Sequence, residues 1–281
     1  MINAATNTAQ MSIFDAQTII LSFGAGVDSS AILLIHLFVK DLGIQYVVFA
    51  DTGAEHPDTY RNVEYFKALC EAHGLPFYVV SKGGETITEW CLRLGTVPVM
   101  AGGAHVCSKK FKGDVIQKWA KDQGFEWPVY LIGIEANEGY RHKRFTAPKG
   151  DCAEYQYPLV EMGLDREACE QIIADHGITV RKSSCMFCPF MSMGEIEEAL
   201  NDPEHEQVIR MVENNFQKGS AEKHQACLDN GQPTDSAGRA LRGMWKKDSW
   251  KEGRRLFVKT INGRQLSVSE WREYFKVSKA A

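Results

Sequence analysis

What the sequence lacks excludes several classes of protein. No apolar stretch in its 281 residues approaches the roughly 20 needed for a membrane-spanning helix. The first residues carry no basic segment followed by an apolar one, so we expect no secretory signal and a cytoplasmic location. There is no internal repeat and no long low-complexity tract. With 44% hydrophobic and 24% charged residues, the composition is that of a folded globular protein.

Familiar ligand-binding signatures are missing as well. The segment 22–30, S-F-G-A-G-V-D-S-S, lacks the lysine of the Walker P-loop, and Ser29 stands where a dinucleotide-binding motif has its third glycine. Among eight cysteines, C-x-x-C occurs only at Cys185 and Cys188, so a zinc site built from two such pairs is excluded. No cysteine follows Cys227. A phosphate site or a metal site in this chain must therefore be of another kind.

Acidic and basic residues are unevenly distributed. The net charge is −4, yet residues 239–281 contain twelve Lys or Arg against four Asp or Glu. This segment also holds Trp245, Trp250 and Trp271. An acidic body with a basic, tryptophan-rich end is a candidate for contact with nucleic acid through phosphate contacts and base stacking. The alternative is a solvated helical face with its tryptophans in the core.

Short apolar runs alternate with amphipathic segments in the first half of the chain. We expect an α/β fold: an open, mostly parallel twisted sheet with helices on both faces. In such sheets ligands bind beyond the carboxyl ends of the strands. The expected strands are 18–23, 46–50, 76–80 and 128–132, and the expected helices are 28–40, 56–73 and 110–123.

The second half is predicted to be mainly helical. Helices are expected at 165–176 and 193–217, followed by a polar loop or linker at 219–238. We therefore predict two domains, a nucleotide-binding domain at 1–195 and a helical, basic C-terminal extension at 196–281.

The segment 22–30 joins the first expected strand to the first expected helix. Its small residues allow close approach of the backbone to an anion, and the N–H groups at the start of a helix attract negative charge. Ser22, Ser29 and Ser30 add hydroxyl groups. These features favour a phosphate site; the alternative is a tight turn without a ligand.

Three motifs resemble those of a known family. In the segment 24–29, Gly26, Asp28 and Ser29 match the S-G-G-x-D-S pattern of the PP-loop ATP pyrophosphatase superfamily, whereas Gly24 and Ala25 replace its first serine and glycine. The segment 49–59, F-A-D-T-G-A-E-H-P-D-T, resembles the D-T-G, E, P, T element of the phosphoadenosine phosphosulfate (PAPS) reductase branch. The segment 133–141, G-I-E-A-N-E-G-Y-R, resembles its G-x-x-x-x-E-x-x-R element. The resemblance spans about residues 17–195.

This resemblance implies an adenine nucleotide alpha hydrolase-like fold with ATP lying across the strand ends. Magnesium is expected with the ATP because it bridges phosphate oxygens. The implied catalytic residues are Asp28, Ser29, Asp51 and Arg141, the last followed by His142, Lys143 and Arg144. The implied nucleotide-binding residues are Ser22, Phe23, Gly24, Gly26, Asp28, Ser29, Ser30, Asp51, Gly53, Glu55, Gly133 and Glu138.

A fourth resemblance concerns the cysteines. The segment 107–112, C-S-K-K-F-K, is similar to C-[ST]-x-x-[WYF]-K, whose cysteine joins a later C-x-x-C to hold a cluster in iron–sulfur members of the family. It implies a [4Fe–4S] cluster on Cys107, Cys185 and Cys188. The fourth ligand is expected to be Cys152, with Cys169 or an exogenous ligand as alternatives. Zinc, or no metal, remains the alternative to iron.

Two reactions are known in families with these motifs. We expect an ATP pyrophosphatase that adenylates a substrate for sulfur incorporation into nucleic acid, as in DNA phosphorothioation or tRNA thiolation, beside a cysteine desulfurase. The alternative is a PAPS or adenylylsulfate reductase of sulfate assimilation, but the C-terminal E-C-G-[IL]-H tail that carries the nucleophile of those enzymes is absent. A second alternative is a nucleotide- and metal-binding subunit without turnover.

Overall fold

A parallel sheet forms the centre of the molecule. The computed structural model describes residues 17–98, 105–140, 152–231 and 254–280. Five strands lie in the order β3-β2-β1-β4-β5, and each neighbouring pair is parallel. The predicted fold class is confirmed, with β5 as a strand that the sequence did not predict. The strands are β1 (Ile19–Phe23), β2 (Tyr46–Asp51), β3 (Phe77–Ser81), β4 (Val129–Ile132) and β5 (Glu154–Gln156).

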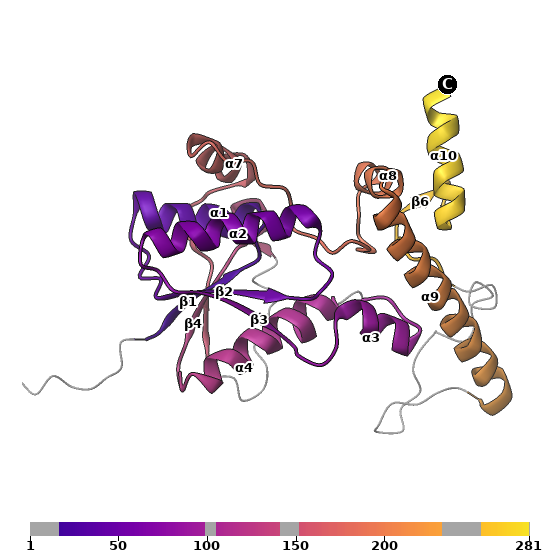
Figure 1. Cartoon of the computed structure of the whole chain (residues 1–281), viewed down its shortest axis with the longest axis horizontal. Coiled ribbons are helices and arrows are strands. Elements are labelled where there is room, and N and C mark those ends of the chain that lie inside the picture. The colour runs from indigo at the N-terminus through magenta and orange to yellow at the C-terminus, as the bar shows by residue number, and fades with distance from the viewer. Residues whose placement is uncertain (1–16, 99–104, 141–151, 232–253, 281) are drawn as a thin grey trace, which may run out of the picture.

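Helices cover both faces of this sheet (Figure 1). Side chains of a strand alternate between faces; in β2, Val47 and Phe49 pack into one apolar cluster and Val48 and Ala50 into another. Because both faces are buried, the strands consist of nearly continuous apolar runs. One face is covered by α1 (Val27–Leu34), α2 (Pro57–Ala72) and α7 (Arg166–Asp175), and the other by α4 (Asp114–Asp122).

The strand order fixes where a ligand can bind. β1 lies between β2 and β4, so the connections that leave β1 and β3 run to opposite sides of the sheet. At such a switch point the loops that follow the two central strands separate and leave a crevice at their carboxyl ends. This crevice lies between the loop after β1 and the residues that follow β4.

Two predicted helices contain π-helical turns. The helix expected at 28–40 consists of α1 and a π-helix, η1 (Ile35–Val39). The helix expected at 110–123 begins earlier, as the π-helix η2 (Cys107–Gly113), and continues as α4. π-Helical turns are rare and concentrate at functional sites. The sequence did not predict the short helices α3 (Ile87–Leu94) and α6 (Pro158–Glu161), or the 3₁₀ turn η3 (Ala136–Glu138).

The C-terminal part contains three further helices and a small hairpin. The helix expected at 193–217 is interrupted at Asp202, whose side chain accepts from the backbone N–H of Glu204 and of His205, with Pro203 in the first turn of the next helix. The elements are α8 (Met193–Asn201), α9 (Pro203–Asn230), β6 (Thr260–Ile261), β7 (Arg264–Gln265) and α10 (Val268–Ala280).

The loop predicted at 219–238 is wrong for residues 219–230, which belong to α9. Gly219, the first residue of that predicted loop, lies where α9 crosses the end of α3. A β-carbon on Gly219 would stand 2.6 Å from the α-carbon of Gly95. The glycine therefore permits a close approach of two backbones and does not end the helix.

An apolar cluster extends across the predicted domain boundary at 195/196. It joins Ile87, Phe111 and Phe187 to Phe216 and Trp271. The C-terminal helices thus pack against α3, η2 and the segment that carries the C-x-x-C pair. The boundary itself stays a prediction.

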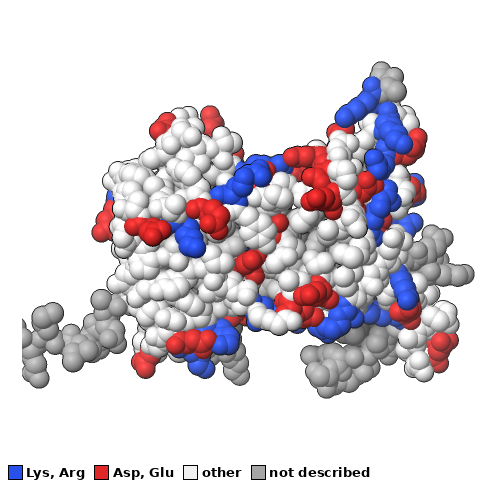
Figure 2. Space-filling view, viewed as in Figure 1, with Lys and Arg blue, Asp and Glu red and all other residues white. Residues whose placement is uncertain are grey.

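The basic C-terminal segment is only partly described. Trp271 has no exposed surface and stacks on Phe275, so the alternative of a tryptophan in the core holds for this residue. Trp245 and Trp250 lie outside the described residues. Figure 2 shows Lys and Arg side chains along α10 with Asp and Glu beside them. The ion pairs are Arg264–Glu270, Arg272–Glu206, Lys276–Glu273 and Lys279–Glu197.

None of the helices in the described part of the chain combines the length and the apolar character that a bilayer-spanning segment needs.

Candidate functional site

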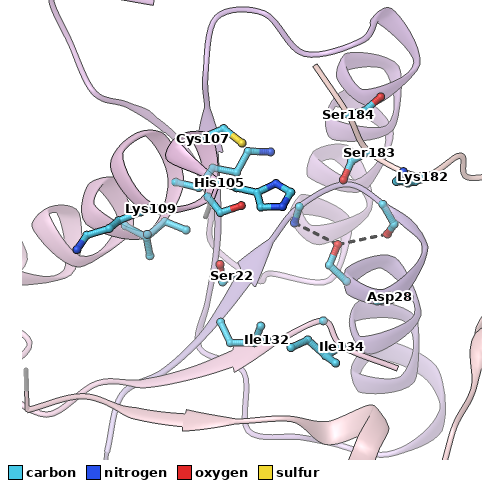
Figure 3. A pocket seen from close by; sticks show the side chains of 18 of the residues that line it. Ser22, Asp28, His105, Cys107, Lys109, Ile132, Ile134, Lys182, Ser183 and Ser184 are labelled. Atoms are coloured by element: carbon cyan, nitrogen blue, oxygen red, sulfur yellow. Dashed lines mark hydrogen bonds between the residues drawn. The ribbon is translucent and has the colours of Figure 1, made fainter. Parts of the chain in front are cut away.

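A cavity of about 1040 Å³ opens at the carboxyl ends of β1 and β4 (Figure 3). It is lined by residues from the loop after β1, the end of β4, η2 and the segment 182–190. The switch point of the strand order therefore coincides with a cavity. This volume is at the upper end of the roughly 300–1,000 Å³ of most small-molecule sites.

The loop after β1 is held in shape by Ser29. Its Oγ accepts from the backbone N–H of Gly24 at 3.1 Å and donates to the carbonyl of Gly26 at 3.3 Å; these bonds are dashed in Figure 3. Between the two glycines, Ala25 has a left-handed φ of 55°. This conformation costs a residue with a β-carbon about 1–2 kcal/mol, so the surrounding packing holds a strained turn at this position. The loop leads into the N-terminus of α1, where backbone N–H groups attract anions.

Two other segments approach the loop closely. A β-carbon on Gly133, directly after β4, would stand 2.8 Å from the backbone nitrogen of Ser29, so a glycine is required there. A β-carbon on Gly26 would stand 2.9 Å from the Oγ of Ser183. The hydroxyl of Ser183 therefore lies over the loop and adds a donor from the segment that leads to the C-x-x-C pair.

Asp28 forms an ion pair with Arg166 across the cavity wall. The Arg166 Nη1 lies 2.7 Å from the Asp28 Oδ1. Burial raises the pKa of Asp28 above its ordinary value; Arg166 opposes this, while Glu138 and Glu135 add to it. Arg166 is the first residue of α7 and was not identified from the sequence. It brings a guanidinium to the loop where phosphate is expected.

Glu55 and Lys112 form a second ion pair at the other end of the cavity. Glu55 is only 1% exposed, and its Oε1 accepts from Lys112 Nζ at 2.8 Å and from the Thr52 hydroxyl at 3.0 Å. Burial favours a lower pKa for Lys112, but Glu55 and the thiols of Cys107 and Cys185 outweigh it and raise that pKa. Glu55 also pairs with Cys185 through an isolated backbone bridge. The ion pair therefore lies directly beside the cysteines.

Cys107, Cys185 and Cys188 all line the cavity. A hydrogen bond from the Cys185 thiol, opposed by burial, lowers the pKa of Cys188 to about 7; the same bond, together with burial, raises the pKa of Cys185. Burial also raises the pKa of Cys107, against the effect of Lys112. Among the described residues, no three His, Cys, Asp or Glu side chains are placed to hold one metal ion.

The other cysteines lie elsewhere. Cys152 is exposed and does not line the cavity. Cys169 is buried in the core between α7 and the sheet, and burial raises its pKa to about 12. Burial also raises the pKa of Cys70 and of Cys91 to about 12. The structure thus brings together three of the four predicted cluster ligands, and Cys152 is not beside them.

The structure brings most of the predicted nucleotide-binding residues to one cavity. The residues that line it are Ser22, Gly24, Gly26, Asp28, Ser29, Glu55, Gly133 and Glu138.

Four others, Phe23, Ser30, Asp51 and Gly53, do not line it. Phe23 packs in the core against Phe66 and Phe77, so the side chain predicted to bind the nucleotide is directed elsewhere. Ser30 is fully buried behind the loop. The Asp51 carboxylate accepts from the Tyr60 hydroxyl and from the backbone N–H of Gly53. Arg141 and the residues 142–144 lie outside the described residues.

Sequence reasoning missed Arg166, Lys112 and Ser183. All three line the cavity, and the tertiary fold brings them there from segments distant in sequence. For Lys112 a signal was present, because it closes the C-S-K-K-F-K segment. Arg166 gave none, since a basic residue in the first turn of a helix is unremarkable in sequence.

Comparisons with known proteins add one finding. No protein-family model matches the sequence, and no curated protein does. Among solved structures, a crystal structure of phosphoadenylyl-sulfate (PAPS) reductase from Candida auris, in complex with phosphate, matches with a TM-score of 0.40. The chain is similar to a PAPS reductase. The identity is 15%, over 60% of this chain and 78% of that chain, so this likeness carries no argument about the reaction.

Proposed function

We propose that this protein is an ATP pyrophosphatase that forms AMP and pyrophosphate and adenylates an acceptor for sulfur incorporation. The observation that carries the proposal is one cavity lined both by the loop after β1 and by three cysteines. We propose that this loop, residues 22–30, binds phosphate and call it the phosphate loop. An adenylation site and a sulfur source must lie within reach of the same acceptor atom. A cavity of about 1040 Å³ accommodates that arrangement.

The residues around the loop suit a nucleotide triphosphate. The N-terminus of α1 and the hydroxyls of Ser29 and Ser183 offer donors to phosphate oxygens. Arg166, now paired with Asp28, offers two parallel N–H groups to a phosphate. If magnesium binds with the nucleotide, Asp28 is the carboxylate of this loop that would hold it. Arg166 would then be free to bind the phosphates instead of Asp28.

The cysteines suit a cluster better than a single ion. Thiolates that hold a [4Fe–4S] cluster bind different iron atoms and so stand further apart than the ligands of one zinc ion. Cys107, Cys185 and Cys188 would supply three thiolates and leave the fourth position to another ligand. A bound cluster would supply an iron site for sulfur. Lys112 would balance negative charge on these thiolates.

The test is a pair of assays on anaerobically purified protein. Mg-ATP should give pyrophosphate, and Asp28→Asn should abolish its release, whereas Asp122→Asn on the exposed end of α4 should leave it unchanged. PAPS should give no sulfite. Sulfite release from PAPS, without pyrophosphate from ATP, would refute the proposal and indicate the reductase. Tight ATP binding with no product, even with nucleic acid and a desulfurase present, would indicate the subunit without turnover.

A further inference from the structure

The wall of the cavity near the cysteines carries an aromatic pair that the proposed reaction does not yet use. The rings of His105 and Phe190 are stacked, with centroids 4.3 Å apart and planes 23° apart. His105 lies two residues before Cys107, and Phe190 two residues after Cys188. Both rings line the cavity, and His105 is exposed.

Two lysines line the same cavity as this pair. Lys109 and Lys182 line the cavity, and both are exposed. Lys182 comes no closer than 4.0 Å to the carboxylate of Glu195, and Lys109 has no ion pair with a described acidic side chain. Figure 3 shows the Lys109 side chain directed away from Asp28. The buried carboxylate of Glu55 is neutralised by Lys112.

We infer that the acceptor is an unpaired nucleotide of DNA or RNA, whose base stacks on the His105–Phe190 pair and whose flanking phosphates contact Lys109 and Lys182. The inference rests on the proposed function, because it names the acceptor of that reaction. Aromatic side chains next to cations are the usual means of holding single-stranded nucleic acid. An acidic peptide would be attracted by the same lysines, but it would gain nothing from a flat ring surface.

The position of the pair assigns it to the acceptor rather than to the adenine of ATP. Ser183 lies over the phosphate loop, and the chain then leads through Cys185 and Cys188 to Phe190. A base on His105 is therefore placed at the cysteine end of the cavity, where sulfur is handled. The part of the cavity lined by β4, β5 and the residue that follows β5 has Ile132, Tyr155 and Tyr157, side chains that suit the adenine of ATP.

Binding of labelled 12-nucleotide oligomers to the full chain, followed by fluorescence anisotropy, tests the inference. The probes are single-stranded DNA, RNA of the same sequence and the DNA duplex. Single strands should bind more tightly than the duplex, and the tighter of the two single strands identifies the source of the acceptor. His105→Ala should weaken single-strand binding about tenfold, a typical effect of losing one stacked base. His105→Phe should restore it to within about threefold.

A matched control is available in His73, another exposed histidine, whose ring contacts Phe38 at 5.1 Å on the far end of α2. His73→Ala should leave binding unchanged. The double variant Lys109→Ala, Lys182→Ala should lower the slope of log K against log salt by about 1.4, since each phosphate contact to a single strand contributes about 0.7. His105→Ala should leave that slope unchanged.

Two results would overturn the inference. One is an equal loss of affinity for an ATP analogue in His105→Ala, which would assign the ring to the adenine of ATP. The other is binding of single strands and duplex alike, with no effect of His105→Ala. Pyrophosphate release from Mg-ATP is measured on the same preparations. If it occurs while His105-dependent binding is absent, the inference alone fails; if binding occurs without pyrophosphate, the proposed function fails.

Discussion

Replacing Lys112 by methionine should destabilise the fold by about 3 kcal/mol. The substitution leaves the Glu55 carboxylate, 1% exposed, without its cation. For unit charges 2.8 Å apart, an effective dielectric constant of about 20 gives an attraction of roughly 6 kcal/mol. Lys112 is 28% exposed, so part of that attraction is screened. Removing one partner of a buried pair typically costs about 3–5 kcal/mol, and the partial exposure of the Lys112 side chain places the expected value at the lower limit.

A double-variant cycle separates this charge effect from lost packing. Glu55→Gln in the Lys112→Met background should recover most of the loss, because a buried amide needs no counter-charge. Urea unfolding of the full chain, followed by circular dichroism, measures each variant. Lys118→Met serves as the control: it removes an exposed ion pair with Asp122 and should change stability by less than about 0.5 kcal/mol. A loss below about 1 kcal/mol for Lys112→Met would refute the reasoning.

The pKa shift of Lys112 also determines how the stability lost in Lys112→Met depends on pH. The pKa of Lys112 is raised in the fold, so the stabilisation is fully present below the ordinary lysine pKa of about 10.4. It disappears only as the pH rises through the higher value in the folded protein. The difference between wild type and Lys112→Met should therefore stay constant from pH 7 to pH 9.

Three further predictions concern other parts of the molecule. Gly219→Ala should lose about 1–3 kcal/mol in urea unfolding, because its β-carbon would meet the α3 backbone at 2.6 Å, whereas Gly194→Ala in α8, with no atom within 4 Å, should gain about 0.5–1 kcal/mol. Without ligand, Asp28→Asn should be at least as stable as wild type at pH 7, because burial raises the pKa of Asp28 and the fold therefore disfavours its charged form. The difference in stability between the two proteins should shrink below the ordinary aspartate pKa. An Asp28→Asn variant that is less stable than wild type at pH 7 would contradict this reasoning. Cys185→Ser should lose iron from anaerobically purified protein, measured by metal analysis, while Cys152→Ser should retain it; equal loss would restore the exposed cysteine as a ligand.

The sequence was sufficient to predict those strands and helices that neighbouring residues specify by themselves. Apolar runs such as Val47–Phe49 mark strands buried on both faces, and Pro57 marks the first turn of α2. The pattern failed where tertiary contact decides. Gly219 suggested a loop, yet it allows α9 to cross α3, and this distinction depends on Gly95, more than a hundred residues earlier.

The site shows the same division. Motifs identified the acids, Asp28 and Glu55, because they belong to short recognisable segments. Their cations, Arg166 and Lys112, could not be assigned as partners, since each pairing joins segments distant in sequence. For Trp271 the sequence left two alternatives, a nucleic-acid contact or a place in the core, and only the tertiary fold decides between them by burying its side chain completely.

The segment that leads to the C-x-x-C pair connects the two halves of the cavity. Ser183 lies over Gly26 of the phosphate loop, the carbonyl of Ser184 accepts from the backbone N–H of His56, and Cys185 is bridged to Glu55. Three consecutive residues thus contact the loop after β1, the loop after β2 and the buried ion pair. A ligand that displaces Ser183 must move the backbone next to Cys185. The loop after β1 and the cysteines are therefore connected parts of one site, as the reaction that we propose requires.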